Sequence, residues 1–189
     1  EFPVFFNKQV TCVVGPGDDV HMPRVSNLLD YEGELAIVIG RRCRHVPEDR
    51  AAEVIAGYTI ANDLSVRDWQ LRTPTMTLGK SFDTHGPLGP WVVSADELGD
   101  PHSLSIRTHV NDELRQDGST GEMIYDCHQQ VAHLSEALTL EPGDVIGVEM
   151  GVEHVCDRGA HLGGGGQVGA EVGCGVDDRH RSSSGTHCI

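Results

Sequence analysis

Apolar residues in this chain occur in short runs that are typical of strands more often than of helices. Residues 35–39 are consecutive apolar side chains, three of them β-branched, and Gly40 follows, which is the pattern of a buried strand entering a turn. Residues 56–61 predict a second strand. Residues 104–110 alternate in part, and Asn111-Asp112 after them predicts a hairpin corner. We therefore expect strands to dominate the fold.

Two helices are predicted among these strands. Pro47 followed by the acids Glu48 and Asp49 favours a short helix over residues 46–55. Residues 126–138 carry apolar side chains at helical spacing, so His128 and His133 are expected on the polar face of that helix. Residues 140–144 then predict a turn. The predicted class is α+β, dominated by strands.

The pattern changes after residue 146. Residues 147–189 contain no Phe, Trp or Tyr, and they sustain neither a strand nor a helix period. Such a segment buries too little apolar surface to offset the entropy of ordering it. We expect one compact domain over residues 1–146 and a divergent, glycine-rich, disordered tail over residues 147–189. A shifted reading frame is an alternative origin for that tail.

An acidic pair stands where the first predicted strand begins. Glu32 and Glu34 are two residues apart, so their side chains are expected on one face of an extended segment. Two buried carboxylates repel each other, and a cation between them would remove that cost. Oxygen ligands select Mg²⁺, Mn²⁺ or Ca²⁺. The alternative is an exposed, solvated acidic edge.

A second acidic position follows the strand predicted over residues 56–61. Asp63 comes directly after it, and Arg67, Asp68 and Gln70 follow within a few residues. A turn or a helix N-cap is the alternative explanation for Asp63. That alternative leaves the polar cluster after Asp63 unexplained.

These residues belong to linked motifs that occur in a fixed order. The motifs are Asp30-Tyr31-Glu32-x-Glu34, Asn62-Asp63-x-Ser65-x-Arg67-Asp68-x-Gln70 and Gly79-Lys80-Ser81-Phe82-Asp83. Further matches lie in residues 3–8, 14–18, 110–117 and 140–146. Together they resemble the fumarylacetoacetate hydrolase family over about residues 3–146.

The resemblance implies a fold, an activity and a set of site residues. Members of this family share a mixed β-roll or barrel-like core, form homodimers and bind one divalent cation, commonly Mg²⁺ or Mn²⁺. They act on 2-oxo acids and 1,3-dicarbonyl acids by carbon–carbon hydrolysis, decarboxylation, isomerisation or tautomerisation, in the catabolism of aromatic compounds or organic acids. The implied metal ligands are Glu32, Glu34 and Asp63, and the implied catalytic, substrate-lining residues are Arg67, Gln70 and Lys80.

Two elements of the family pattern have no match here. A His-x-x-Glu pair that supplies a base lies upstream of the segment matched by residues 3–8, and a Thr-Gly-Thr-Pro loop follows the segment matched by residues 140–146. A positioned base contributes about 10²–10⁴ in rate. We therefore expect enolisation or decarboxylation rather than hydrolysis. The alternative is a non-catalytic or damaged fragment that keeps only the metal site.

The composition of the chain bears on its binding partners and on its cellular compartment. A net charge of −15 argues against nucleic acid and anionic membranes as partners. No signal peptide and no apolar run of transmembrane length is visible. Six cysteines without CxxC spacing favour a reducing cytoplasm. A zinc site in the tail is not expected, because the spacing of its candidate ligands matches no compact motif: Cys156, His161, Cys174 and His180.

Overall fold

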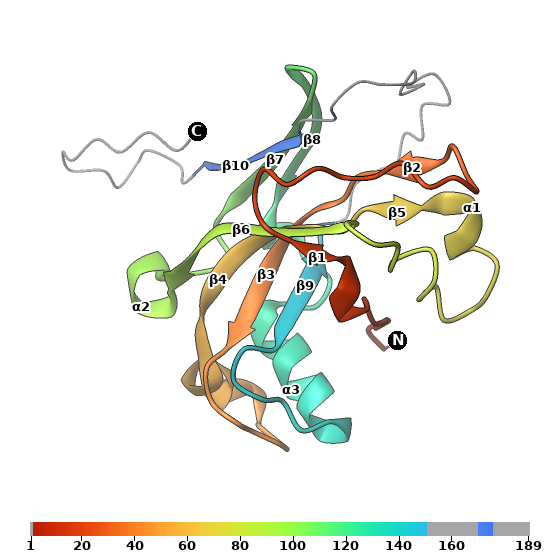
Figure 1. Cartoon of the computed structure of the whole chain (residues 1–189). Coiled ribbons are helices and arrows are strands. Elements are labelled where there is room, and N and C mark those ends of the chain that lie inside the picture. Colours follow the sequence, from red (N-terminus) through yellow and green to blue (C-terminus); the bar gives the residue numbers. More distant parts are fainter. Residues whose placement is uncertain (1, 151–169, 176–189) are drawn as a thin grey trace.

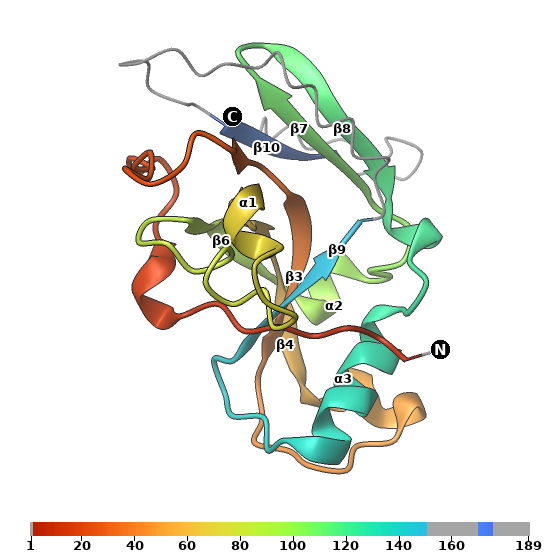
Figure 2. The same cartoon turned by 90° about the vertical axis from the view of Figure 1, so that its right-hand side faces the viewer.

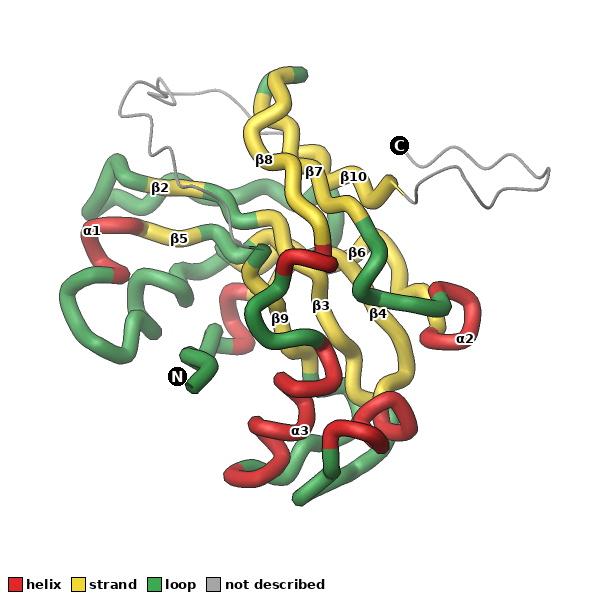
Figure 3. Tube along the Cα trace, turned by 180° about the vertical axis from the view of Figure 1, so that it is seen from behind, coloured by secondary structure: helices red, strands yellow, loops and turns green. Residues whose placement is uncertain are grey.

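The computed structural model of the chain describes residues 2–150 and 170–175. Strands make up most of the regular structure, and the helices are short (Figure 3). The helical elements are η1 (Val10–Cys12), η2 (Glu48–Val54), α1 (Arg67–Gln70), α2 (Ala95–Leu98), η3 (Thr120–Glu122) and α3 (Cys127–Ala137). The predicted strand-dominated α+β class is confirmed.

The largest sheet has five strands in the order β1-β6-β4-β3-β9. Its strands are β1 (Val13–Val14), β3 (Gly33–Ile39), β4 (Ile55–Asn62), β6 (Gly86–Ser94) and β9 (Val145–Glu149). Neighbours are antiparallel except β1 and β6, which pair in parallel. The continuous apolar run of β3 is explained by its place between β4 and β9, where nearly all its residues are buried.

Two smaller sheets accompany it. One has the order β10-β7-β8, and the other pairs β2 with β5. Their strands are β2 (Leu29–Asp30), β5 (Ser65–Val66), β7 (Ser105–Val110), β8 (Glu113–Ser119) and β10 (Ala170–Gly175). The three-stranded sheet and helix α3 lie at opposite ends of the large sheet (Figures 1 and 2). The described strands form three open sheets and no closed barrel, so the expected barrel-like core is not closed in the part of the chain that the structure describes.

Local sequence accounts for the predicted corner and helix. Asn111 and Asp112 both have positive φ, 51° and 64°, as a two-residue turn between antiparallel strands requires. Asp126 caps α3, since its side chain accepts from the Gln129 N–H while the Gln129 side chain accepts from the Asp126 N–H. Val131 of α3 is fully buried in the core, a contribution of about 1.5–3 kcal/mol. Both predictions are confirmed.

The core continues past the expected boundary at residue 146. That boundary falls inside β9, and Val148 and Met150 are only 3% and 2% exposed within the hydrophobic core. β10, at Ala170–Gly175, pairs with β7. The predicted disorder of the rest of the tail concerns residues 151–169 and 176–189, which lie outside the described residues. No helix in the described part is long and apolar enough to cross a membrane.

Candidate functional site

Three carboxylates meet at one end of the β3–β4 pair. Glu32 directly precedes β3, Glu34 lies on it, and Asp63 directly follows β4. Because these strands are antiparallel and Gly33 stands opposite Asn62, the start of β3 lies beside the end of β4. Carboxylate oxygens of all three residues lie within 4.8 Å of one another, and all three side chains are buried. We call these three residues the carboxylate cradle.

Glu34 is the least compensated member of the cradle. Burial raises the pKa of its carboxyl well above the ordinary value, and the like charges of Asp63 and Glu32 raise it further. No described residue makes a hydrogen bond or an ion pair with this carboxylate. A buried carboxylate beside two others without a counter-ion fits a divalent cation, which would supply the missing positive charge.

Lys80 provides a positive charge that contacts two members of the cradle. Its Nζ donates to Glu32 Oε2 at 2.5 Å and to Asp63 Oδ2 at 2.8 Å, and the side chain is 2% exposed. Burial alone would lower the pKa of this ammonium, but the charges of Asp63 and Glu32 outweigh burial and raise it. This geometry fits the expectation that Lys80 lines the site. A lysine of a surface loop would be exposed to solvent, which Lys80 is not.

A second lysine, Lys8, reaches the cradle from the N-terminal segment. Its Nζ lies 2.6 Å from Asp63 Oδ1 and also donates to the backbone carbonyl of Lys80. Sequence reasoning missed this residue, although it stands in one of the matched segments, residues 3–8. The rarity of lysine in this sequence could have pointed to it, because Lys8 and Lys80 are the only lysines in the chain and both lie in matched segments.

Arg67, at the start of α1, braces the outer side of the cradle. Its Nη1 donates to Glu32 Oε1 at 2.5 Å and to Gln70 Oε1 at 3.0 Å. Its Nε donates to Asp30 Oδ2 at 2.8 Å, while Nη2 lies 2.6 Å from the same oxygen without hydrogen-bond geometry. Burial opposes the charge on Arg67, but Glu32 and Asp30 raise its pKa. Arg67 therefore positions a cradle carboxylate, and it holds Gln70 close by.

Asp68 is the member of the predicted polar cluster that turns away. Its carboxylate accepts from Ser26 Oγ at 2.5 Å and lies 3.4 Å from Arg72 Nη2. Without Asp68, the site holds four carboxyl groups and three cations, so one carboxyl group has no cation of its own: Asp30, Glu32, Glu34 and Asp63 beside Lys8, Arg67 and Lys80.

Two glycines make room for this arrangement. A Cβ at Gly147 of β9 would lie 2.2 Å from Glu34 Oε2, so the side chain of Glu34 occupies the space that glycine leaves. A Cβ at Gly79 would lie 2.1 Å from the backbone nitrogen of Gln70. Gly79 thus lets the segment that carries Lys80 pass directly beside α1.

Replacing Gly147 by Ala should weaken Mg²⁺ binding by about tenfold or more while leaving the fold intact. The added methyl meets the far end of a side chain that can rotate, so Glu34 leaves its position and the backbone does not move. Titration of Mg²⁺ with calorimetry, beside thermal unfolding, measures both effects. Gly118→Ala is the matched control, because among the described residues a Cβ there meets only Met150 Cβ, at 3.6 Å. If the affinity for Mg²⁺ is unchanged in Gly147→Ala, Glu34 is not a ligand of the cation.

Comparisons with known proteins match this chain to proteins of one family. Residues 1–172 match the family model described as fumarylacetoacetate (FAA) hydrolase C-terminal. A mitochondrial oxaloacetate tautomerase of Xenopus laevis is 43% identical over 146 residues, covering 76% of this chain and 46% of that protein. The matched range extends past residue 146 and includes all of β9.

Solved structures agree with this match. The 5-carboxymethyl-2-hydroxymuconate delta-isomerase of Mycobacterium smegmatis superposes with a TM-score of 0.76 at 43% identity, covering 80% of this chain and 59% of that one. The fumarylacetoacetate hydrolase of Exiguobacterium antarcticum gives 0.83 at 38% identity, covering 90% and 62%. The chain spans about half the length of the curated relatives it matches, 56% and 46% in two cases.

Proposed function

This chain belongs to the fumarylacetoacetate hydrolase family, and from that premise we propose that it acts with a divalent cation on 2-oxo acids or 1,3-dicarbonyl acids. The observation that carries the proposal is the cradle of Glu32, Glu34 and Asp63, buried and within 4.8 Å of one another. These three residues would hold the ion, and their all-oxygen donor set suits Mg²⁺ or Mn²⁺, with Ca²⁺ a further option. When bound, the ion supplies Lewis-acid polarisation of a substrate oxygen.

The side chains around the cradle have separate tasks in this proposal. Lys80 places a fixed positive charge in a buried site, where it can stabilise an oxyanion or enolate as negative charge develops on the substrate. Arg67 holds Glu32 in one orientation through its contact with Oε1. Lys8 holds Asp63 in the same way through its contact with Oδ1. Gln70, fixed by Arg67, is assigned to substrate contact.

Enolisation is the reaction class that these residues favour. As the α-proton passes to water, negative charge develops on the substrate oxygen, and Lys80 and a bound cation would stabilise that charge. Hydrolysis also needs an activated and aimed water, and no histidine in the described part is bonded to the cradle or to Lys80. The printed names of two relatives, a tautomerase and a delta-isomerase, describe the same class of chemistry in those proteins. The homodimer and the cytoplasmic location stay predictions.

The test offers enol and keto oxaloacetate, a diene-dioate and an acylpyruvate in parallel, with Mg²⁺ or with EDTA. We expect tautomerisation or isomerisation to run at least about 10²-fold faster with Mg²⁺, and acylpyruvate cleavage to stay near the background rate. Fast cleavage abolished by EDTA would contradict the preference for enolisation. No Mg²⁺-dependent turnover of any substrate would favour the alternative, a fragment that keeps the metal site without activity.

A further inference from the structure

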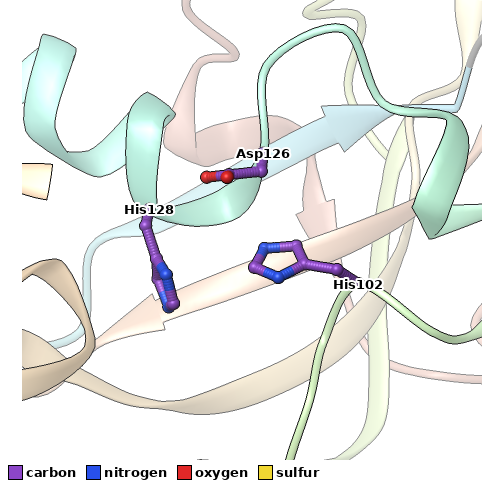
Figure 4. Close-up of side chains that lie close together, drawn as sticks. All are labelled: His102, Asp126 and His128. Carbon is purple, nitrogen blue, oxygen red and sulfur yellow. The ribbon is translucent and has the colours of Figure 1, made fainter. Parts of the chain in front are cut away.

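A second group of potential ligands lies apart from the cradle, where the loop before β7 meets the start of α3. His102 belongs to that loop, Asp126 is the N-cap of α3, and His128 lies in its first turn. One donor atom from each of the three lies within 4.8 Å of the others. Figure 4 shows the two imidazole rings and the carboxylate gathered on one side of the helix start. None of these residues belongs to the site described above.

We propose that His102, Asp126 and His128 form a second metal site, for a transition metal ion such as Zn²⁺. Two imidazoles and one carboxylate are a donor set that suits zinc, whereas the all-oxygen cradle suits Mg²⁺ or Mn²⁺. The two sites therefore select different ions. Three protein ligands leave a fourth position for water or an external ligand.

Asp100 lies beside the first of these ligands. Its Oδ1 accepts from the His102 backbone N–H at 3.0 Å and lies 3.2 Å from His102 Nδ1 without hydrogen-bond geometry, which places a carboxylate beside the ring nitrogen away from the proposed ion. Metal-binding histidines commonly donate their other N–H to such a carboxylate, which fixes the ring and the tautomer. His102 Nε2 then presents its lone pair toward the helix start, where it accepts from the Cys127 N–H at 3.3 Å. A metal ion would take the place of that long hydrogen bond.

The other two ligands keep a donor available. Asp126 uses Oδ1 to cap α3, accepting from the Gln129 N–H at 2.8 Å, and its second oxygen can bind an ion without breaking the cap. The ring of His128 stands edge-on to that of His102, with centroids 5.1 Å apart and planes at 90°. A tetrahedral zinc site brings donor atoms to about 3.3 Å of one another. All three side chains are half-buried, so rotations of their side chains can close the remaining distance.

Charge decides whether an ion is tolerated at this position. The positive end of the α3 dipole opposes a cation. The carboxylate of Asp126 would contact the ion directly, and that of Asp100 lies on the far side of the His102 ring, so their negative charges offset the dipole. A bound ion would tie the loop that leads into β7 to the start of α3. The expected consequence is a higher thermal unfolding midpoint in the presence of zinc, by mass action on the folded state.

The experiment must resolve single residues, since the chain holds 11 histidines and 6 cysteines. Zn²⁺ is titrated into the whole chain with the cradle saturated by Mg²⁺, and the histidine ring ¹H–¹⁵N signals are followed by NMR. We expect the His102 and His128 signals to move together at the lowest zinc concentrations. His102→Gln, Asp126→Asn and His128→Gln should each weaken this binding by about tenfold or more. Asparagine at 126 retains a capping oxygen, so that variant keeps α3 intact.

His133→Gln, on the same helix but outside the cluster, is the matched control and should bind zinc like the parent. Zinc that perturbs only other histidines, or equal affinity in parent and His128→Gln with native circular dichroism, would overturn the proposal. Mg²⁺-dependent turnover should be unchanged in His128→Gln. Failure of this site and failure of the proposed function are therefore distinguishable.

Discussion

Replacing Glu34 by Gln is expected to abolish Mg²⁺-dependent turnover while stabilising the metal-free protein. The change removes one of three ligands, and the charge stabilisation lost with the ion corresponds to about 10³-fold or more in rate. It also removes a carboxylate whose pKa is raised well above its ordinary value, first by burial and then by the like charges of Asp63 and Glu32. Activity and metal-free stability thus move in opposite directions.

The two effects are measured by initial rates with saturating Mg²⁺ and by urea unfolding in EDTA. Glu97→Gln is the matched control, because Glu97 is an exposed residue of α2 remote from the cradle. It should leave both quantities unchanged. A Glu34→Gln protein that is inactive and also less stable without metal would show that this carboxylate supports the fold, contrary to our account.

Replacing Gly79 by Ala should destabilise the protein by about 3 kcal/mol or more and remove activity. Its Cβ would lie 2.1 Å from the Gln70 backbone nitrogen and 2.4 Å from Gln70 Cα, distances that only a backbone shift can relieve. That shift separates α1 from the segment carrying Lys80. It also strains the hydrogen bond from the Val66 N–H to the Gly79 carbonyl, 2.8 Å long.

Urea unfolding and initial rates give both readings for this substitution. Gly118→Ala, again the control, should lower the free energy of unfolding by less than about 1 kcal/mol, because its methyl would lie at an ordinary van der Waals distance from Met150. Full activity in Gly79→Ala would mean that the close approach of α1 to Lys80 is not required for the site.

The sequence predicts best where local pattern and tertiary context agree. The apolar run of β3 lies between two strands, and Asn111-Asp112 adopts the positive φ values that its residue types tolerate. The spacing of Glu32 and Glu34 in an extended segment brings their carboxylates together as expected. Asp63 joins them because β4 ends beside the start of β3.

What the sequence could not predict depends on contacts between distant segments. Lys8 reaches Asp63 across 55 positions, and no local pattern marks that contact. The room that Gly147 leaves for Glu34 is visible only once β9 pairs with β3. The lack of periodicity over the long, glycine-rich segment after residue 146 predicts that the core ends there, whereas Val148 of β9 and Met150 just after it continue the core.

The segment over residues 46–55 shows the limit of helix signals. Proline and acids at its start do begin a helical turn, but it forms as the 3₁₀ element η2 over Glu48–Val54. Only Ala51 of this element is buried. Val54 also packs against the core, partly buried. Two such small apolar contacts give little packing energy to extend an α-helix, so the tighter geometry of a short connector is retained.

Calorimetric titration of Mg²⁺ into the parent protein, Glu34→Ala and Glu97→Ala tests the central claim most directly. We predict one binding site in the parent and in Glu97→Ala, and affinity lower by about 100-fold or more in Glu34→Ala, since one of three carboxylate ligands is lost. Equal binding by all three proteins would contradict the assignment of Glu32, Glu34 and Asp63 as the metal ligands.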